Sequence, residues 1–196
     1  YLPAGIYAEL RTASNLRYRL QGELTGIENR LARWFSIYFP EYKTVYGNLD
    51  AISGLMVLKA APLPEDIVAL GVDGVNQIWR DAKMRAVGKK RAQTLVAAAE
   101  HSIGTTEGLT AARYEIRLLL EDYESRSEKL KEVMDLIEEL VHQIPMADKL
   151  LEIKGIGIRT VSGFLAEIGD LGRFSDPKQL QKLAGYALKE NSSGKH

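Results

Sequence analysis

Apolar residues recur at alternating three- and four-residue steps along the first forty positions. Residues at this spacing share one face of a helix, so the pattern predicts a long helix with a single apolar stripe. Proline cannot donate the backbone hydrogen bond that a continuing helix needs, and we expect the helix to end before Pro40. Arg17 is the polar exception in the stripe, which consists of Ile6, Leu10, Ala13, Leu20, Leu24, Ile27, Leu31, Trp34 and Tyr38.

A more regular pattern runs from Leu109 to Ile144 and is interrupted only by Arg126. It predicts a coiled-coil helix of about five heptads, roughly 50 Å long at 1.5 Å per residue. One heptad position is filled by Leu109, Ile116, Tyr123, Leu130, Ile137 and Ile144, and the other by Ala112, Leu119, Val133 and Leu140. Toward the end of this helix the apolar face widens, and we expect a further element to pack there, against Met134, Leu136 and Val141.

The two long helices can pair antiparallel within the chain, or each can pair with a second copy. The sequence does not separate these arrangements. We favour a homodimer through the coiled coil, because a seam of this length is more often a contact between subunits than an isolated projection.

Glycines and prolines divide the middle of the chain into short helices. Pro64, followed by two acidic residues, suits a helix start, Gly71 suits a helix end, and Gly88 suits the start of a helix rich in alanine. No segment strongly indicates a strand. We therefore expect an all-α fold, with long helices forming a coiled coil and a small C-terminal helix-hairpin-helix domain, in four segments: residues 1–40, 41–106, 107–145 and 146–196.

Composition limits the function less than the patterns do. Lys and Arg together number 26, as do Asp and Glu, so a nucleic-acid surface has to come from local clustering of cations. Cysteine is absent, which excludes disulfides and thiolate chemistry. No signal peptide and no apolar run long enough to span a membrane is visible, so we expect a cytoplasmic protein with no membrane partner. Because the chain starts at Tyr1 without methionine and stops after His196, we expect it to be part of a longer protein.

The segment from Leu150 to Ile168 has the pattern of two helices joined by a tight glycine turn. Glycines permit positive φ and close approach of the backbone, which leaves the amide groups at the start of the second helix free to face a phosphate. Core-like spacing of Ile153, Ile156, Leu165 and Ile168 supports the paired helices. We predict sequence-independent DNA binding here, through Lys154, Gly155, Ile156, Gly157, Arg159 and Thr160. The alternative is a tight turn inside a helical bundle.

A second set of cations precedes the alanine-rich helix and is opposed by Asp81 alone. Such a cluster at a helix start can bind RNA or DNA phosphates, and a solvated helical face is the equally weighted alternative. The cluster consists of Arg80, Lys83, Arg85, Lys89, Lys90 and Arg91, of which Arg85, Lys89, Lys90 and Arg91 are the candidate nucleic-acid contacts.

The C-terminal quarter resembles the C-terminal domain of the insertion sequence one-ten family of transposases. The order and spacing of its motifs carry the likeness: Ile153–Gly157, Ala166–Asp170, Arg173–Phe174, Lys178–Leu180, Ala184–Gly185 and Ser192–Lys195. The Ala86–Ala92 segment and the heptads are compatible with the same family. The resemblance implies a recombinase that is guided by a bridge RNA and acts on DNA, with an N-terminal domain that carries a metal-binding acidic tetrad.

The resemblance also places the family's serine nucleophile at Ser193, with Ser192 as the fallback. The simpler interpretation of Ser-Ser-Gly is a flexible tail or a cloning remnant. The acidic tetrad is absent, because Asp50, Asp66 and Asp73 lack acidic partners at metal-site spacing. We therefore expect no cofactor and no metal site in this chain, Mg²⁺ only in the N-terminal domain, and no activity of this chain alone.

Three functions remain open at this point. The first is a fragment of a serine-type transposase that contributes dimerisation, DNA contacts and guide-RNA contacts. The second is a non-enzymatic helix-hairpin-helix module of a DNA repair or junction-processing protein. The third is a coiled-coil scaffold without nucleic-acid binding, which salt-dependent binding to DNA would exclude.

Overall fold

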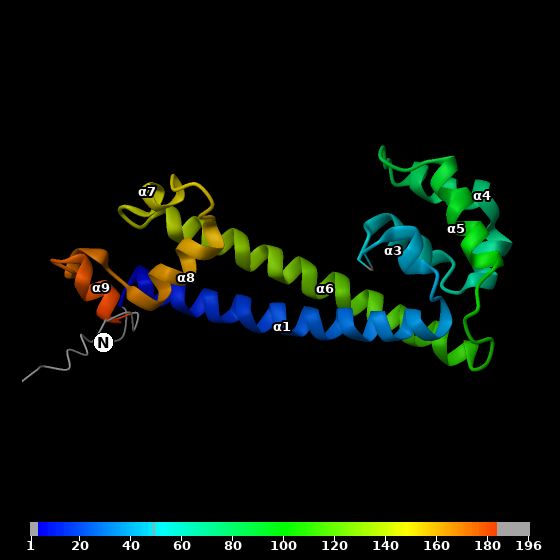
Figure 1. The fold of residues 1–196 in the computed structure, drawn as a ribbon, viewed down its shortest axis with the longest axis horizontal. Coiled ribbons are helices and arrows are strands. Elements are labelled where there is room, and N and C mark those ends of the chain that lie inside the picture. The colour runs from blue at the N-terminus through cyan, green and yellow to red at the C-terminus, as the bar shows by residue number, and fades with distance from the viewer. Residues whose placement is uncertain (1–3, 49, 184–196) are drawn as a thin grey trace, which may run out of the picture. The chain divides into compact units, whose positions relative to one another are not determined.

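The computed structural model describes residues 4–48 and 50–183, and every regular element in this part of the chain is a helix (Figure 1). No strand occurs in that part, and the predicted all-α fold is confirmed. The elements are α1 (Ile6–Tyr38), α2 (Tyr42–Tyr46), α3 (Ile52–Ala60), α4 (Pro64–Asp81), α5 (Lys89–Glu100), α6 (Leu109–His142), α7 (Ala147–Leu151), α8 (Ile158–Ile168), the 3-10 helix η1 (Leu171–Arg173) and α9 (Pro177–Leu183).

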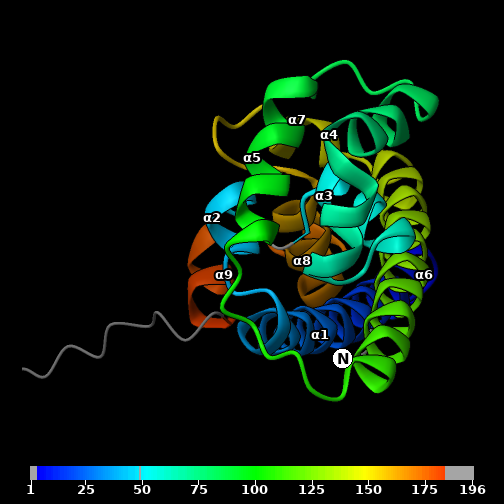
Figure 2. The ribbon, with the colours of Figure 1, turned by 90° about the vertical axis from the view of Figure 1, so that its right-hand side faces the viewer.

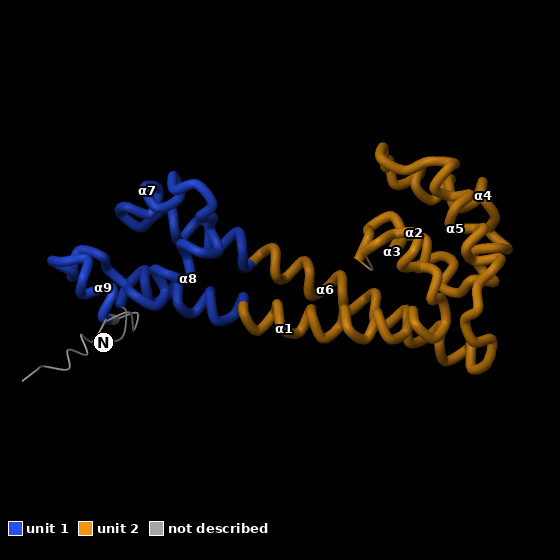
Figure 3. Tube along the Cα trace, viewed as in Figure 1, with its two compact units in different colours: residues 1–17, 133–196 blue, residues 18–132 orange. Residues whose placement is uncertain are grey.

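The chain forms two compact units (Figure 3). Unit 1 comprises residues 1–17 and 133–196, and unit 2 comprises residues 18–132. Both boundaries fall inside the long helices, so α1 and α6 each contribute residues to both units. The four segments expected from the sequence stay a prediction.

Within unit 2, α1 and α6 lie side by side and run antiparallel (Figures 1 and 2). The indole Nε1 of Trp34 donates a hydrogen bond to the carbonyl oxygen of Ala112 at 3.1 Å, and Arg126 Nε lies 2.9 Å from the carboxylate of Glu23. The contact earlier on α1, at Glu23, lies later on α6, at Arg126, as an antiparallel pair requires. Of the two pairings that the sequence left open, unit 2 has the one within the chain.

Apolar heptad residues of α6 are buried in this helix pair. The side chains of Ala112, Ile116 and Leu119 are buried, as are those of Ile27 and Leu31 on α1. Burial of such side chains supplies the main stabilisation of a helix pair, at about 25 cal/mol for each square ångström of apolar surface removed from water. Arg126, which interrupts the heptads, lies at the rim of the seam and pairs with Glu23.

Short helices complete the core of unit 2. Pro64 is the first residue of α4, where its missing N–H group costs nothing, and Gly88 precedes α5 as expected. Gly71 has φ +68° and interrupts α4 with a kink rather than ending it. The buried side chains of this core include Phe39, Tyr42, Leu58, Leu63, Ile67, Trp79, Leu95 and Val96.

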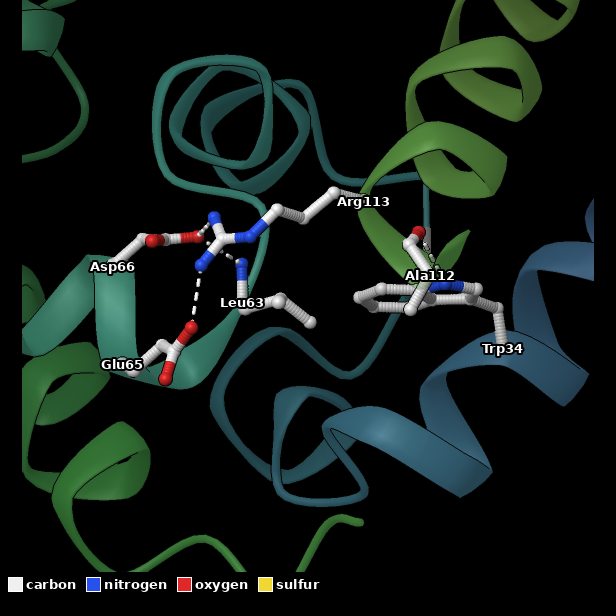
Figure 4. Close-up of polar contacts among 6 residues, drawn as sticks. All are labelled: Trp34, Leu63, Glu65, Asp66, Ala112 and Arg113. Carbon is white, nitrogen blue, oxygen red and sulfur yellow. Dashed lines mark hydrogen bonds and ion pairs between the residues drawn. The ribbon is translucent and has the colours of Figure 1, made fainter. Parts of the chain in front are cut away.

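Arg113 of α6 joins the start of α4 (Figure 4). Its guanidinium donates to the carboxylate of Asp66 and, at 2.5 Å, to that of Glu65. Asp66 also accepts a hydrogen bond from the backbone N–H of Leu63 at 3.0 Å, which caps the first turn of α4. The hydrogen bond to Asp66 is the main reason that the pKa of Arg113 is raised. The carboxylates that cap α4 therefore also attach it to α6.

The loop between α5 and α6 crosses the end of α1. The amide of Thr105 donates to the carbonyl of Ile37 at 2.9 Å, and a Cβ on Gly104 would lie 2.2 Å from the carbonyl oxygen of Tyr38. Only glycine fits so close an approach. The carboxylate of Glu41 accepts hydrogen bonds from Ser102 Oγ at 2.6 Å and from the amide of Ile103 at 2.9 Å. These contacts hold the loop against the carbonyl end of α1.

Unit 1 has its own core, which includes the buried side chains of Leu10, Val133, Ile137, Val141, Ala147, Val161 and Leu165. Of the residues expected to widen the apolar face of α6, Val141 is buried, whereas Leu136 is 45% exposed. At the start of α9, Asp176 accepts a hydrogen bond from the amide of Lys178 at 2.8 Å, as its predicted capping role requires. In the described part of the chain, no helix combines the length and the apolar character that crossing a bilayer requires.

Candidate nucleic-acid interface

The predicted glycine turn joins α7 to α8 in unit 1. Gly155 has φ +89°, so a side chain at this position would be strained, and the amide of Ile156 closes the turn on the carbonyl of Ile153 at 3.0 Å. Gly157 precedes α8 and has an extended backbone, with φ −109° and ψ 177°. The expected positive φ is therefore confirmed at Gly155 and wrong at Gly157, where any residue fits.

The start of α8 is open to solvent. A Cβ on Gly155 or on Gly157 would meet no atom within 4 Å, and both glycines are exposed. No side chain caps α8, because Gly157 has none to offer. The turn expected for phosphate binding is therefore not packed shut against the described residues, and the first amide groups of α8 have no side-chain acceptor.

Two cations flank this turn. Lys154 and Arg159 are exposed, and neither forms an ion pair with any described residue. Thr160 is also exposed, and its amide donates to the carbonyl of Gly157 at 2.9 Å. The positive end of the helix dipole and two unpaired cations therefore lie within a few residues of one another, an arrangement that attracts anions.

The sequence predicted that the apolar residues near the turn lie in the core, but not all of them are buried. Leu165 is fully buried, and Ile156 and Ile168 are half-buried. Ile153 is 48% exposed, so its predicted place in the core is wrong. It belongs to the turn that follows α7 rather than to a helix, and a turn does not continue the helical face. Val161 instead is the buried residue of the first turn of α8.

The second basic cluster surrounds the start of α5 in unit 2. Residues 86–91 line a surface hollow there, together with Thr94. Arg80, Lys83, Arg85 and Lys90 are exposed and form no ion pair within the described part of the chain. Lys89 lies 3.1 Å from Asp73, so the expectation that Asp81 alone opposes the cluster is wrong. Asp81 accepts a hydrogen bond from Gln77 instead.

Arg91 has a structural role in this cluster. It donates to the carbonyl of Val45 at 2.7 Å and lies over the ring of Tyr46, 5.2 Å from its centroid. Burial raises the pKa of Tyr46 to about 12, although the nearby Arg91 charge lowers it, so the ring is neutral at physiological pH. Arg91 therefore attaches α5 to α2, and of the four candidate contacts Arg85 and Lys90 are the ones left free to meet a phosphate.

The acidic side chains singled out in the sequence do not come together. Asp66 binds Arg113, Asp73 binds Lys89, and Asp50 lies 3.4 Å from the hydroxyl of Tyr123. Among the described residues no group of three His, Asp or Glu side chains is arranged to hold a metal ion. The donor set that Mg²⁺ requires is thus not assembled in this part of the chain, and Ser192 and Ser193 lie outside the described residues.

One feature of unit 2 was not visible in the sequence. A cleft opens where the end of α1, the start of α4 and the loop between α5 and α6 meet. Its walls come from segments that are far apart in the chain, so no local motif marks it. The apolar residues Val68 and Ile103 are exposed near it, but the sequence does not mark their exposure, and single exposed apolar residues are common on protein surfaces.

A family model described as "Transposase IS116/IS110/IS902 family" matches residues 147–196. The match covers about a quarter of the chain and includes α7, the glycine turn, α8, η1 and α9. The likeness expected from the sequence is confirmed for this segment. No curated protein and no solved structure matches the chain.

Proposed function

We propose that the chain is part of a DNA transposase and that its C-terminal segment contacts DNA. One observation carries the proposal: the segment that matches the transposase family contains an exposed glycine turn, an uncapped helix start and two unpaired cations, Lys154 and Arg159.

Binding would use the phosphate backbone. The first amide groups of α8 donate to phosphate oxygens, and Lys154 and Arg159 contribute charge on either side. Gly155 and Gly157 let the backbone approach the strand, and Ile156 and Thr160 lie on the same turn. Contacts of this kind do not read bases, so the affinity falls steeply with salt and varies little with sequence.

Guide-RNA binding is assigned to the second cluster in this proposal. Arg85 and Lys90 would contact phosphates directly, and Lys89 would do so after release from Asp73. Arg91 would contribute from its fixed position beside Tyr46. The exposure of Arg85 and Lys90, together with the hollow at the start of α5, supports this assignment.

Strand transfer is assigned to Ser193, with Ser192 as the fallback. The serine oxygen attacks a backbone phosphorus and displaces a deoxyribose oxygen, which leaves as a hydroxyl group after gaining a proton. The described residues do not fit a metal site, so no step is assigned to Mg²⁺ within this chain. In a protein that joins this chain to the family's metal-binding N-terminal domain, a covalent protein–DNA adduct should form, persist in Ser192→Ala and disappear in Ser193→Ala.

A homodimer is part of the proposal, but it would require surface outside the seam that α1 and α6 bury in unit 2. Tyr114 and Leu118 are 56% and 41% exposed and lie four residues apart on α6, so they share one helical face. Sedimentation would detect the dimer, and Leu118→Glu should weaken it. A monomer at all concentrations would contradict this part of the proposal.

DNA binding is tested with two variants at Gly157. Both Gly157→Asn and Gly157→Asp fit the extended backbone and supply a side-chain cap to α8, but only Asp adds a negative charge where the phosphate would lie. Fluorescence anisotropy with a short labelled duplex should show a modest loss of affinity for Asn, whose side chain occupies amide groups that the phosphate would use, and a further loss of roughly tenfold or more for Asp. Equal affinities for the two variants, or no salt-dependent binding by the unmodified chain, would reject the proposal.

A further inference from the structure

The cleft in unit 2 has apolar walls and a charged edge. Its volume is about 390 Å³, and Tyr38, Leu63, Val68 and Leu109 supply much of the apolar wall. Glu65, Glu100 and Thr105 are among its polar lining residues. The described residues that line it include no Lys, Arg or His. Its chemistry therefore differs from that of the basic hollow at the start of α5.

Apolar surface at the cleft remains in contact with water. Val68 is 39% exposed, and Ile103 is 85% exposed between the lining residues Ser102 and Gly104. The loop that carries Ile103 is held in place, because the carboxylate of Glu41 accepts a hydrogen bond from the Ile103 amide and the Thr105 amide donates one to the end of α1. These two residues alone are ordinary, but beside a cleft with apolar walls of its own they add apolar surface that a ligand can cover.

Negative charge is in excess around the cleft. Glu65 shares the guanidinium of Arg113 with Asp66 (Figure 4), and Glu100 forms no ion pair with a described residue. Two helices, α1 and α5, also end at the cleft with Tyr38 and Glu100, and the carbonyl ends of helices carry partial negative charge. The start of α4 has the opposite polarity, but its own Glu65 and Asp66 offset it.

These features select one class of ligand. A nucleic-acid phosphate would be repelled by the carboxylates, and a bare metal ion would gain nothing from the apolar walls. The side chains of arginine and lysine combine an apolar stem with a cationic head. We propose that this cleft binds an arginine or lysine side chain of a basic, apolar peptide segment in a partner protein, with the stem against Leu63 and Val68 and the head at Glu100.

The test uses the full chain and a synthetic peptide with one arginine between two leucines. Its matched partner carries citrulline, which has nearly the same shape but no charge, in place of arginine. Amide chemical shifts recorded during titration report binding at Val68, Thr105 and Leu109. We expect the arginine peptide to perturb these amides and to bind roughly tenfold more tightly than the citrulline peptide, as is ordinary for one charge-assisted hydrogen bond.

Two variants test the roles of the carboxylate of Glu100 and of the apolar wall at Val68. Glu100→Gln should lower the affinity for the arginine peptide to that for the citrulline peptide, and should leave the latter unchanged. Val68→Ser should weaken the binding of both peptides. Glu128→Gln, at an exposed position on α6, is the control and should change the binding of neither peptide. Thermal unfolding verifies that each variant folds. Equal binding of the two peptides, no effect of Glu100→Gln, or perturbation of the cleft by an oligonucleotide instead of the peptide would overturn the proposal.

Discussion

Trp34 donates its indole N–H to the backbone carbonyl of Ala112, across 3.1 Å and in a buried position (Figure 4). The donor is a side chain near the end of α1, and the acceptor belongs to the first turn of α6. Apolar heptad residues alone allow one helix to shift along another by a full repeat. The hydrogen bond specifies one position, so it determines which part of α6 lies beside the end of α1.

Replacing Trp34 with Phe should destabilise unit 2 by about 2–3 kcal/mol. The substitution removes one buried hydrogen bond and leaves space where the larger ring was. Urea unfolding followed by circular dichroism measures the loss. Tyr114→Phe, at an exposed position on α6, is the control and should change stability by less than about 0.5 kcal/mol. A similar effect of both substitutions would mean that the indole bond contributes nothing measurable.

Gly54 is a second position where a small substitution should lower the stability of the fold. A Cβ there would lie 2.0 Å from the hydroxyl oxygen of Tyr42. The Tyr42 ring cannot move aside easily, because it is fully buried and stacked on Phe35 at 4.1 Å between ring centroids. Gly54→Ala should therefore destabilise the protein by about 2 kcal/mol, even though alanine favours a helix interior by about 1 kcal/mol.

The Tyr42 hydroxyl gives a companion prediction. It is buried and has no hydrogen-bond partner among the described residues. Tyr42→Phe should then leave stability unchanged or raise it by about 1 kcal/mol, since no bond is lost and a polar group leaves the core. In the double variant with Gly54→Ala, part of the clash should disappear, and chemical denaturation should show less than additive destabilisation. A large loss from Tyr42→Phe alone would reveal a bound partner for the hydroxyl.

The sequence was informative wherever one local rule decided the outcome. The apolar period predicted α1 and α6 almost to their ends, and Pro64 and Gly88 marked the starts of α4 and α5. The geometry of the turn was also predictable at Gly155, which has positive φ. In each case the cause lies within a few residues of the effect.

Features that depend on contacts between distant residues were not predictable. Asp73 lies sixteen positions before Lys89, and Val45 forty-six before Arg91, so nothing local indicated that these partners reduce the free charge of the basic cluster. Ile153 fitted a core period, but it lies in a turn and is exposed. Pairing of α1 with α6 of the same chain, seen at Trp34–Ala112 and Glu23–Arg126, was not predictable either, because the apolar period is the same for pairing within and between chains.

Glu41 should make stability depend on pH. Burial alone would raise the pKa of its carboxyl, but the hydrogen bonds from Ser102 and Ile103 outweigh this and lower the pKa below the ordinary 4.5. A carboxyl with a lowered folded-state pKa stabilises the protein fully above its unfolded pKa and loses that contribution as the pH falls through the folded pKa. The Glu41 contribution should therefore be present at pH 7 and lost as the pH falls through the folded-state pKa, which lies below 4.5.

Glu41→Gln isolates this contribution from that of the other carboxyls. It should be less stable than the unmodified chain by about 1 kcal/mol at neutral pH, and the difference should shrink toward zero in acid. Glu107→Gln, in the same loop and exposed, is the control and should change stability at neutral pH by less than about 0.5 kcal/mol. A difference for Glu41→Gln that stays constant from neutral pH into acid would show that the carboxylate charge is not responsible.

The basic cluster at the start of α5 makes the last prediction. Arg85→Glu and Lys90→Glu should weaken binding of a short single-stranded RNA, and each lost phosphate contact should reduce the salt slope of the binding constant by about 0.7. Arg91 is not a suitable variant, because its change would also remove the bond to Val45. Charge reversal at the exposed Lys129 and Lys131 of α6 alters the net charge equally and serves as the control. If the control pair weakens RNA binding as much as the α5 pair does, the effect is one of overall charge, and the start of α5 is an ordinary solvated face.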